Sequence, residues 1–586
     1  MDATSTVYKQ LDALLPVLGN TLYSTSTPVL LHSLRCVTLL VTRFPIAKLP
    51  GMRRALPVYV NQILQIIKMS GGGGGNVGGT DGDLMQGALR ALGTIVRDGP
   101  KPTKASDGTP IPGVELKEKD LTFLLELVTP DLEDPDKQGV AFALLRAIVS
   151  RRFVVPEMYD IMEDQVAPLL VQSQSGTVRE QARALLLQFM LDYPQGKGRL
   201  QKTLAFLLRN ASSYVHESGR TSILELLGAV LSKFQSGLIA EYGEMIFVSL
   251  VMVLANDDNA KCREVAAALV ATLYSRFSED DRKNIIRSWL KKWVKAGIDS
   301  PDGSEGTSGK RKLAYIALQV WGIVIEAAVK EEGADVAWIS EAVEDISASL
   351  QQSKVLMAKA VADREDDDME VDGHVEPEWQ LPYYSLTAFG KALKVQPTLA
   401  RFDAIKKKNV VEAPWSLVTE HLLYPHSWVR TAASRTLGQL FAAYPLGSSH
   451  ATNIQLVSNS PVFIADRAGA VGDLREVAAK LCDQLKSEHL GEALALQVVK
   501  NLVWIGRYWL SRLSEGKTLA NTEELDENED DDEDAEEGLE TETADLSDIP
   551  WLFSKLSYQV RGALIRRRGR HGRTVSAPFM VGSGVT

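Results

Sequence analysis

The chain has 586 residues, of which 45% are hydrophobic and 24% are charged, and its formal net charge is -11. A single compact core rarely grows to this size, so several domains or an open array of repeats is expected. The three cysteines lie far apart in the sequence, which argues against a disulfide framework or a cysteine-rich zinc site.

No membrane or secretory segment is expected. The longest apolar stretch, which begins at Ile246, is about half of what a bilayer crossing needs. The residues after Met1 lack the basic and then apolar pattern of a secretory signal. A cytosolic or nuclear protein without a membrane partner is therefore predicted.

The acidic balance comes from two tracts. The segment 363–378 has a net charge of -8 and the segment 526–548 has a net charge of -14, so the rest of the chain carries +11 against the total of -11. Such tracts repel themselves and contain little that could pack, so we expect them to be disordered. The remainder of the chain is mildly basic and compatible with a nucleic-acid partner.

Helical periodicity dominates the whole chain, since apolar residues recur three and four positions apart and two-residue alternation is nearly absent. The predicted fold class is all-α, a HEAT/armadillo-like α-solenoid (superhelix) with disordered Gly-rich and acidic loops and a C-terminal basic helix. In chain order we expect N-terminal helical repeats (1–70), a Gly-rich loop (71–83), HEAT-like repeats (84–300), a flexible loop (301–311), helical repeats (312–362), an acidic loop (363–378), HEAT-like repeats (379–515), an acidic disordered linker (516–549) and a C-terminal helix with a basic tail (550–586).

A short pattern recurs along the chain, in which an arginine near a helix start is followed three residues later by an alanine. Arg220 opens a looser copy, 41 residues after Arg179 and 43 residues before Arg263. Arg430 and Arg475 are 45 residues apart. Paired-helix HEAT repeats have this period. The four full copies contain Arg179 with Ala182, Arg263 with Ala266, Arg430 with Ala433 and Arg475 with Ala478.

The repeated residue types suit the seam between stacked helices. An alanine one turn inside the helix lets a neighbouring helix approach closely, and an arginine in the first turn can join polar contacts with the next repeat. We interpret these arginines as structural, with contact to a partner on the inner face as the alternative. Thr177 with Glu180, and Asp473 with Glu476, have capping-box spacing, which predicts helix starts just before the arginine.

No combination of residues predicts an enzyme. The sequence before Lys310 resembles a phosphate-binding loop, but Ser304 replaces its first glycine and Arg311 its magnesium-binding Ser or Thr. His421 and His426 are five residues apart, whereas a helical metal pair needs four. We expect no catalytic residue, no cofactor, no metal and no small-molecule substrate.

Basic groups are the better candidates for a binding function, because each could neutralise phosphates. Isolated lysine groups are usually solvated surface, and the main alternative for an arginine tail is a nuclear-import signal. The terminal arginines follow a predicted amphipathic helix from Pro550. The groups are Lys291, Lys292 and Lys295; Lys406, Lys407 and Lys408; and Arg566, Arg567, Arg568, Arg570 and Arg573.

A family resemblance is carried by three stretches of the chain. They are residues 128–210, LLYPHSWVRTAASRTLGQLF from Leu422 and LFSKLSYQVRGALIRRR from Leu552. They resemble the C-terminal region of the U-three small nucleolar RNA-associated protein 20 family, also called the down-regulated-in-metastasis family. Its members are HEAT-repeat components of the small-subunit processome and are several times longer. The last residues, TVSAPFMVGSGVT, depart from the family's basic helical end.

The resemblance implies a non-enzymatic scaffold of the 90S pre-ribosome that is needed for 18S ribosomal RNA processing and small-subunit biogenesis. It implies pre-ribosomal RNA and U-three snoRNP and processome proteins as partners, and a location in the nucleus and nucleolus. The alternative is a HEAT-repeat protein-binding adaptor of the nuclear-transport-receptor or phosphatase-scaffold type, with no RNA contact.

Overall fold

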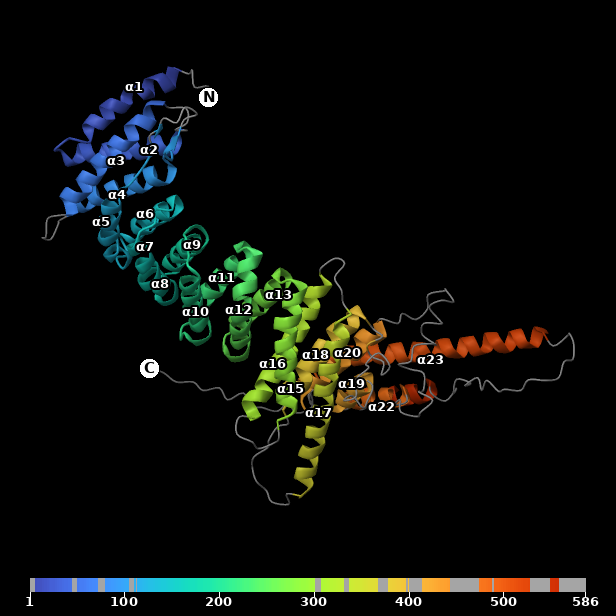
Figure 1. Ribbon diagram of the computed structural model, residues 1–586. Helices are drawn as coiled ribbons and strands as arrows, with labels where there is room; N and C mark the ends of the chain where they lie inside the picture. The colour runs from blue at the N-terminus through green and yellow to red at the C-terminus, as the bar shows by residue number, and fades with distance from the viewer. Residues whose placement is uncertain are drawn as a thin grey trace, which may run out of the picture. The chain divides into compact units, whose positions relative to one another are not determined.

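The computed structural model forms two compact units, Met1–Leu269 and Val270–Thr586, and the boundary between them falls within one helix (Figure 1). We describe each unit by itself. The structure describes residues 6–44, 50–71, 80–104, 110–111, 113–300, 307–330, 337–366, 378–396, 399, 414–442, 474–486, 490–526 and 549–557.

The first unit is built from consecutive helices. Its elements are α1 (Thr6–Thr21), α2 (Thr27–Arg43), α3 (Pro50–Gly71), α4 (Thr80–Asp98), β1 (Thr103–Lys104), β2 (Pro110–Ile111), α5 (Glu118–Val128), the 3-10 turn η2 (Pro130–Leu132), α6 (Gln138–Arg151), α7 (Pro156–Ile161), the π-helical turn η3 (Met162–Val166), α8 (Ala167–Gln172), α9 (Gly176–Asp192), α10 (Lys197–Ser213), α11 (Glu217–Lys233) and α12 (Ser236–Asn256). Helix α13 (Ala260–Arg276) crosses the boundary.

These helices stack in two layers. In one layer α2, α4, α6, α9 and α11 each contact the next, and in the other α8, α10 and α12 do so. The layers are joined because sequential helices also pack on each other, as α10 does on α11. Apolar residues three and four apart, such as Ile223, Leu227 and Leu231 of α11, are fully buried between the layers.

The second unit repeats this architecture. Helices α16, α18, α20 and α23 form one chain of contacts, and α15, α17 and α19 form another. Its elements are α14 (Glu279–Asp281), the π-helical turn η4 (Arg282–Arg287), α15 (Ser288–Ile298), α16 (Thr307–Val329), α17 (Ile339–Asp366), α18 (Gln380–Val395), α19 (Pro414–Glu420), the 3-10 turn η7 (His421–Leu423), α20 (Ser427–Ala442), α22 (Leu474–Gln484) and α23 (Glu492–Asp526).

The predicted all-α HEAT/armadillo-like class is confirmed. Among the described residues, β-structure is limited to the two-residue strands β1 and β2, in which Thr103 pairs with Ile111 in an antiparallel register. Two helices, α12 and α16, contain windows apolar and long enough to cross a membrane by composition alone. Half of the window in α12 and 61% of that in α16 are buried inside the fold, as in core helices.

Several predicted boundaries differ from the structure. Helix α16 begins at Thr307, inside the predicted flexible loop 301–311. An exposed polar turn can form the start of this helix, because the apolar periodicity of the following residues anchors it. Helices α17 and α23 likewise run to Asp366 and Asp526, inside the predicted acidic segments, since Glu, Leu and Ala are strong helix formers.

The predicted capping box in α9 was wrong by two residues. Ser175 is the N-cap, and its side chain accepts a hydrogen bond from the N–H of Val178. Thr177 therefore lies in the first turn, where its hydroxyl contacts Ser175 Oγ at 2.8 Å. The second predicted cap, Asp473, lies outside the described residues, and α22 begins at Leu474.

Candidate interaction surface

The repeat residues predicted from the sequence lie where neighbouring helices meet. Each of the four alanines is fully buried, with an exposed fraction of 0%. They are Ala182 in α9, Ala266 in α13, Ala433 in α20 and Ala478 in α22. The tentative RNA-binding residues, Arg566, Arg567, Arg568, Arg570, Arg573, Lys406, Lys407 and Lys408, lie outside the described residues.

The repeated arginines share a contact that the sequence pattern did not reveal. The Nη1 group of Arg220 in α11 donates to the backbone oxygens of Tyr214 at 2.8 Å and Val215 at 2.9 Å. Tyr214 is the C-cap of α10, where helix carbonyls lack partners within the helix. The arginine therefore closes the end of the preceding helix from the start of its own.

The same arrangement recurs at a fixed spacing of six residues. Arg179 donates to Ser173 O at 2.7 Å, Arg263 to Asp257 O at 2.6 Å, and Arg430 to Tyr424 O at 2.9 Å. The three acceptors are the C-caps of α8, α12 and η7. We call Arg179, Arg220, Arg263 and Arg430 the arginine ladder.

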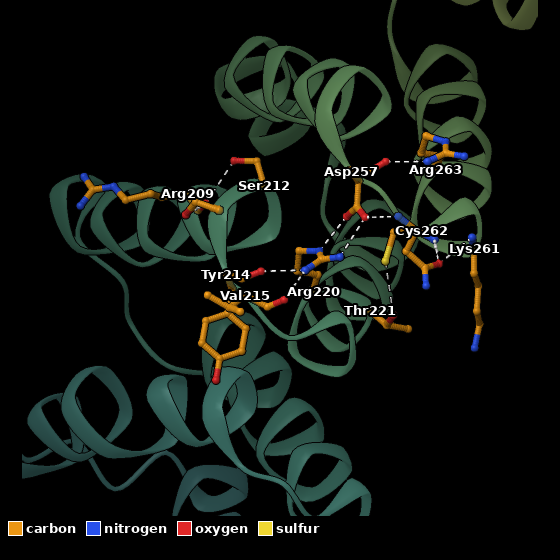
Figure 2. Close-up of polar contacts among 12 residues, drawn as sticks. Arg209, Ser212, Tyr214, Val215, Arg220, Thr221, Asp257, Lys261, Cys262 and Arg263 are labelled. Carbon is orange, nitrogen blue, oxygen red and sulfur yellow. Dashed lines mark hydrogen bonds and ion pairs between the residues drawn. The ribbon is translucent and has the colours of Figure 1, made fainter.

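Two ladder arginines of the first unit also reach the following repeat. Arg179 Nε donates to Ser222 Oγ of α11 at 3.1 Å. Arg220 binds both carboxylate oxygens of Asp257, with Nε–Oδ2 2.7 Å and Nη2–Oδ1 2.9 Å. Figure 2 shows Arg220 between the Tyr214 and Val215 carbonyls on one side and Asp257 on the other. The Arg220 side chain thus links the loop before α11 to the loop after α12.

Asp257 is the residue that the sequence interpretation missed. Its side chain is 1% exposed, and it also accepts from the N–H of Asn259 at 2.8 Å. Burial raises the pKa of the Asp257 carboxyl, but the hydrogen bonds from Arg220 and Asn259 outweigh it and hold the pKa below its ordinary value. The carboxylate is therefore charged at neutral pH and serves the fold.

Arg475 uses a different contact from the ladder. Its guanidinium lies 4.9 Å from the ring centroid of Trp551, in the helical segment 549–557. Leu552 of the same segment is buried and approaches Gly506 of α23. The described beginning of the predicted C-terminal helix thus packs against α22 and α23.

Two solvent-accessible hollows lie along the helices. One, of about 440 Å³, lies against α9 and α11 and has charges of both signs, including Arg179, Arg183 and Glu225. Another, of about 530 Å³, lies against α20 and α23 and includes Arg435, Lys500 and Trp504. Across the part of the chain that the structure describes, no group of three or more His, Cys, Asp or Glu residues is arranged to hold a metal ion.

The two histidines considered from the sequence do not approach as metal ligands. His421 is fully buried, and its ring nitrogens contact Leu417 O at 2.6 Å and Ser353 Oγ at 3.3 Å. His426 stacks on Trp379 with the ring centroids 4.8 Å apart. Burial lowers the pKa of His421, so the imidazole is neutral in the folded unit.

The stacked helix pairs and the arginine ladder define a class of protein, the HEAT/armadillo-like helical-repeat proteins. Within it, the chain is 29% identical over 503 residues to U3 small nucleolar RNA-associated protein 20 of Schizosaccharomyces pombe. It is 26% identical over 502 residues to the protein of the same name from Saccharomyces cerevisiae. The predicted resemblance to this family is confirmed.

The matches cover 86% and 85% of this chain but only 17% of each relative. The chain thus spans about a sixth of the length of the curated relatives. No family model matches it. Among solved structures, it resembles Kap121p bound to Nup53p, at 13% identity and a TM-score of 0.38 over 88% of this chain and 48% of that chain. It also resembles Kap121p, at 12% identity and a TM-score of 0.32 over 96% and 64%.

Proposed function

We propose that the chain is a non-enzymatic helical-repeat scaffold of the small-subunit processome, needed for 18S ribosomal RNA processing and small-subunit biogenesis in the nucleolus. The observation that carries this proposal is the similarity to two U3 small nucleolar RNA-associated proteins over 86% and 85% of the chain. The matches include both units rather than one isolated repeat.

The geometry supports a scaffold because the repeated polar residues hold the stack together. Arg220 and Asp257 are occupied by each other and by loop backbone, and Arg179 by Ser222 and two carbonyls. Partners would therefore bind to the exposed faces and to the basic segments. We propose pre-ribosomal RNA and U3 snoRNP and processome proteins as those partners.

The C-terminal arginines are the proposed tether to RNA or to protein lying against it. They are Arg566, Arg567, Arg568, Arg570 and Arg573. The reason for this proposal is chemical, because the five arginines follow a helix whose first turns pack on α23 through Leu552. Lys406, Lys407 and Lys408 are a second proposed contact with phosphates.

The test is affinity purification of the tagged protein from cells, followed by RNA sequencing and mass spectrometry. We expect pre-ribosomal RNA, the U3 RNA and processome proteins to be enriched, and depletion of the protein to slow 18S maturation. Recovery of a small GTPase or a phosphatase subunit, without RNA, would establish the adaptor alternative and overturn the proposal.

A second arm tests the tether by changing the five arginines to alanine. We expect RNA crosslinking and 18S maturation to fall while the protein still reaches the nucleolus. If crosslinking and maturation are unchanged and only nuclear entry fails, the tail is an import signal and the RNA contact is wrong.

A further inference from the structure

The helix α15 and the turn η4 before it carry an excess of positive charge. Between Asp281 and Asp299 the chain has six basic residues and no acidic one. Three of them have partners inside the second unit. Arg282 Nε donates to Tyr274 O at 2.8 Å, Arg287 pairs with Glu279, and Lys291 pairs with Glu341.

Lys292 and Lys295 are different, because both are exposed and neither forms an ion pair within the described residues. Lys292 Nζ lies 5.0 Å from the centroid of the Trp289 ring, which is a cation–π contact. Free ammonium groups on a rigid helix can neutralise phosphates without first breaking an ion pair.

Two indole rings lie beside these lysines. Trp289 and Trp293 are one helical turn apart, half-buried, with ring centroids 5.3 Å apart and planes inclined by 33°. Leu290 and Val294 are buried, and helical spacing places Lys292 and Lys295 on the side of α15 away from them, with Trp289 and Trp293 along one flank. The aromatic flank and the basic side of α15 therefore meet where Lys292 lies over Trp289.

The first turn of α16 packs against α15 at the buried Gly297. A Cβ added at Gly297 would lie 3.0 Å from the backbone oxygen of Lys310 and 3.5 Å from the Cα of Arg311, so the two helices touch at backbone distance. Figure 1 shows α15 and α16 side by side. Lys310 is exposed and forms no ion pair within the described residues. We call Trp289, Lys292, Trp293 and Lys295 the α15 surface.

We propose that the α15 surface binds single-stranded RNA, with bases stacked on Trp289 and Trp293 and phosphates bound by the lysines. This inference rests on the proposed function in that it takes RNA as the partner, and it adds the place of contact. Single-stranded nucleic acids are bound by this combination of aromatic faces and a basic track, because every base has a π-face. An acidic peptide would satisfy the lysines but would offer nothing that stacks on the indoles.

The first experiment uses the purified full chain and a fluorescein-labelled 12-nucleotide oligouridine in an anisotropy titration. Lys292→Glu combined with Lys295→Glu should weaken binding at least tenfold. The slope of log Kd against log salt should fall by about 1.4, or 0.7 for each phosphate contact of a single strand. Lys233→Glu, an exposed lysine at the end of α11, is the matched control and should change neither value.

The second experiment separates stacking from charge. Trp289→Leu and Trp293→Leu should each weaken oligouridine binding roughly five- to 150-fold, whereas Trp→Phe at either position should retain most of the affinity. Circular dichroism and the melting temperature check that each variant is folded. If a Leu variant does not fold, the Phe variants are used for the test instead. In them, the quenching of tryptophan fluorescence that the bound bases cause in the unchanged protein should be reduced.

The third experiment maps the contact with 5-iodouridine RNA and mass spectrometry. Crosslinks within 289–295 support the inference. Unchanged affinity in the lysine and tryptophan variants, with crosslinks only elsewhere, overturns it and leaves the processome role standing. Binding of polyglutamate that is lost when Lys292 and Lys295 are changed to Glu, without any RNA crosslink to α15, also overturns it in favour of an acidic protein partner. If the tagged chain brings down no pre-ribosomal RNA yet crosslinks oligouridine at α15, the processome role fails and the RNA surface stands.

Discussion

One buried polar contact in each unit shows two ways of joining neighbouring repeats, a charged pair in the first unit and an uncharged cluster in the second. In the first, Arg220 of α11 and the carboxylate of Asp257 make two hydrogen bonds of 2.7 and 2.9 Å. In the second, Ser434 of α20 donates to Gln484 of α22 at 2.7 Å, and Asn501 of α23 donates to Ser434 O at 2.9 Å. Both sets are largely buried and link helices of neighbouring repeats.

The comparison separates a constant part of the repeat from a variable part. In both units an arginine in the first turn closes the preceding helix, as Arg220 and Arg430 do. What the next repeat supplies to that arginine varies, since Arg179 meets the hydroxyl of Ser222 and Arg220 the carboxylate of Asp257. The capping contact is therefore shared by Arg179, Arg220, Arg263 and Arg430, and each seam acquires its own sensitivity to mutation, pH and salt.

The largest expected effect is on the charged seam. Asp257→Ala leaves the guanidinium of Arg220, whose side chain is 13% exposed, without its anion, and removing one partner of a buried pair costs about 3–5 kcal/mol of unfolding free energy. We expect faster hydrogen exchange in α11 and α13 and unchanged exchange in α18–α20. The matched control is Asp258→Ala, which alters an exposed carboxylate beside it. Equal effects of the two changes would show that the pair does not hold the seam.

In the second unit the corresponding test is steric. Ala433 is fully buried, and Ala433→Leu should overpack the approach of α20 to its neighbours at a cost of about 1–3 kcal/mol. Thermal unfolding and hydrogen exchange of α18–α20 measure the effect. Ala442→Leu, at the exposed end of the same helix, should leave both unchanged. No difference between the two variants would mean that this seam tolerates a larger residue.

The sequence was sufficient for the helices, the repeat period and the buried alanines, because periodicity and side-chain size act locally. It was insufficient for the cap of α9, where Ser175 and Thr177 both offer a hydroxyl and the backbone decides between them. The capping role of the arginines was missed because their acceptors are backbone carbonyls, which every residue has. Asp257 was missed because it lies 37 residues from Arg220, and the only local signal was its position six residues before Arg263.

The surface on α15 illustrates the same limit. The lysines were visible as a group, but so were Lys406–Lys408, and composition could not rank them. Only the structure shows that Lys291 is paired with Glu341 and that Lys292 lies over Trp289.

Lower pH should destabilise the second unit through His421. Burial lowers the pKa of His421 in the fold below its unfolded value of about 6.5, so the unfolded chain binds more protons. The stabilising contribution of the neutral ring is complete above pH 6.5 and is lost as the pH falls toward the folded pKa, at up to about 1.4 kcal/mol per pH unit.

The measurement is hydrogen exchange of both units between pH 7 and pH 5, corrected for the intrinsic rates. We expect α17 and η7, which meet through Ser353 and His421, to lose protection, while the Asp257 seam keeps it because the pKa of that carboxyl is lowered from its ordinary value of 3.8 and so lies below the pH range tested. In His421→Leu the extra loss should disappear. A similar pH response in the variant would assign the effect to other groups.

The smallest expected effect sharpens the comparison within a single seam. Arg183 of α9 and Glu225 of α11 form an ion pair whose side chains are 27% and 50% exposed, near the more buried contact of Arg179 with Ser222. Exposed pairs contribute about 0.2–1 kcal/mol, since water screens the charges and the side chains lose freedom. A double-mutant cycle with Arg183→Ala and Glu225→Ala should give a coupling energy in that range, and it should fall further at 1 M salt, where the Debye length is about 3 Å. Comparing this coupling energy with the loss of unfolding free energy in Asp257→Ala then shows how much burial strengthens an arginine–carboxylate pair. A coupling energy as large as the cost of Asp257→Ala, or one insensitive to salt, would show that exposure does not set the strength of these seams.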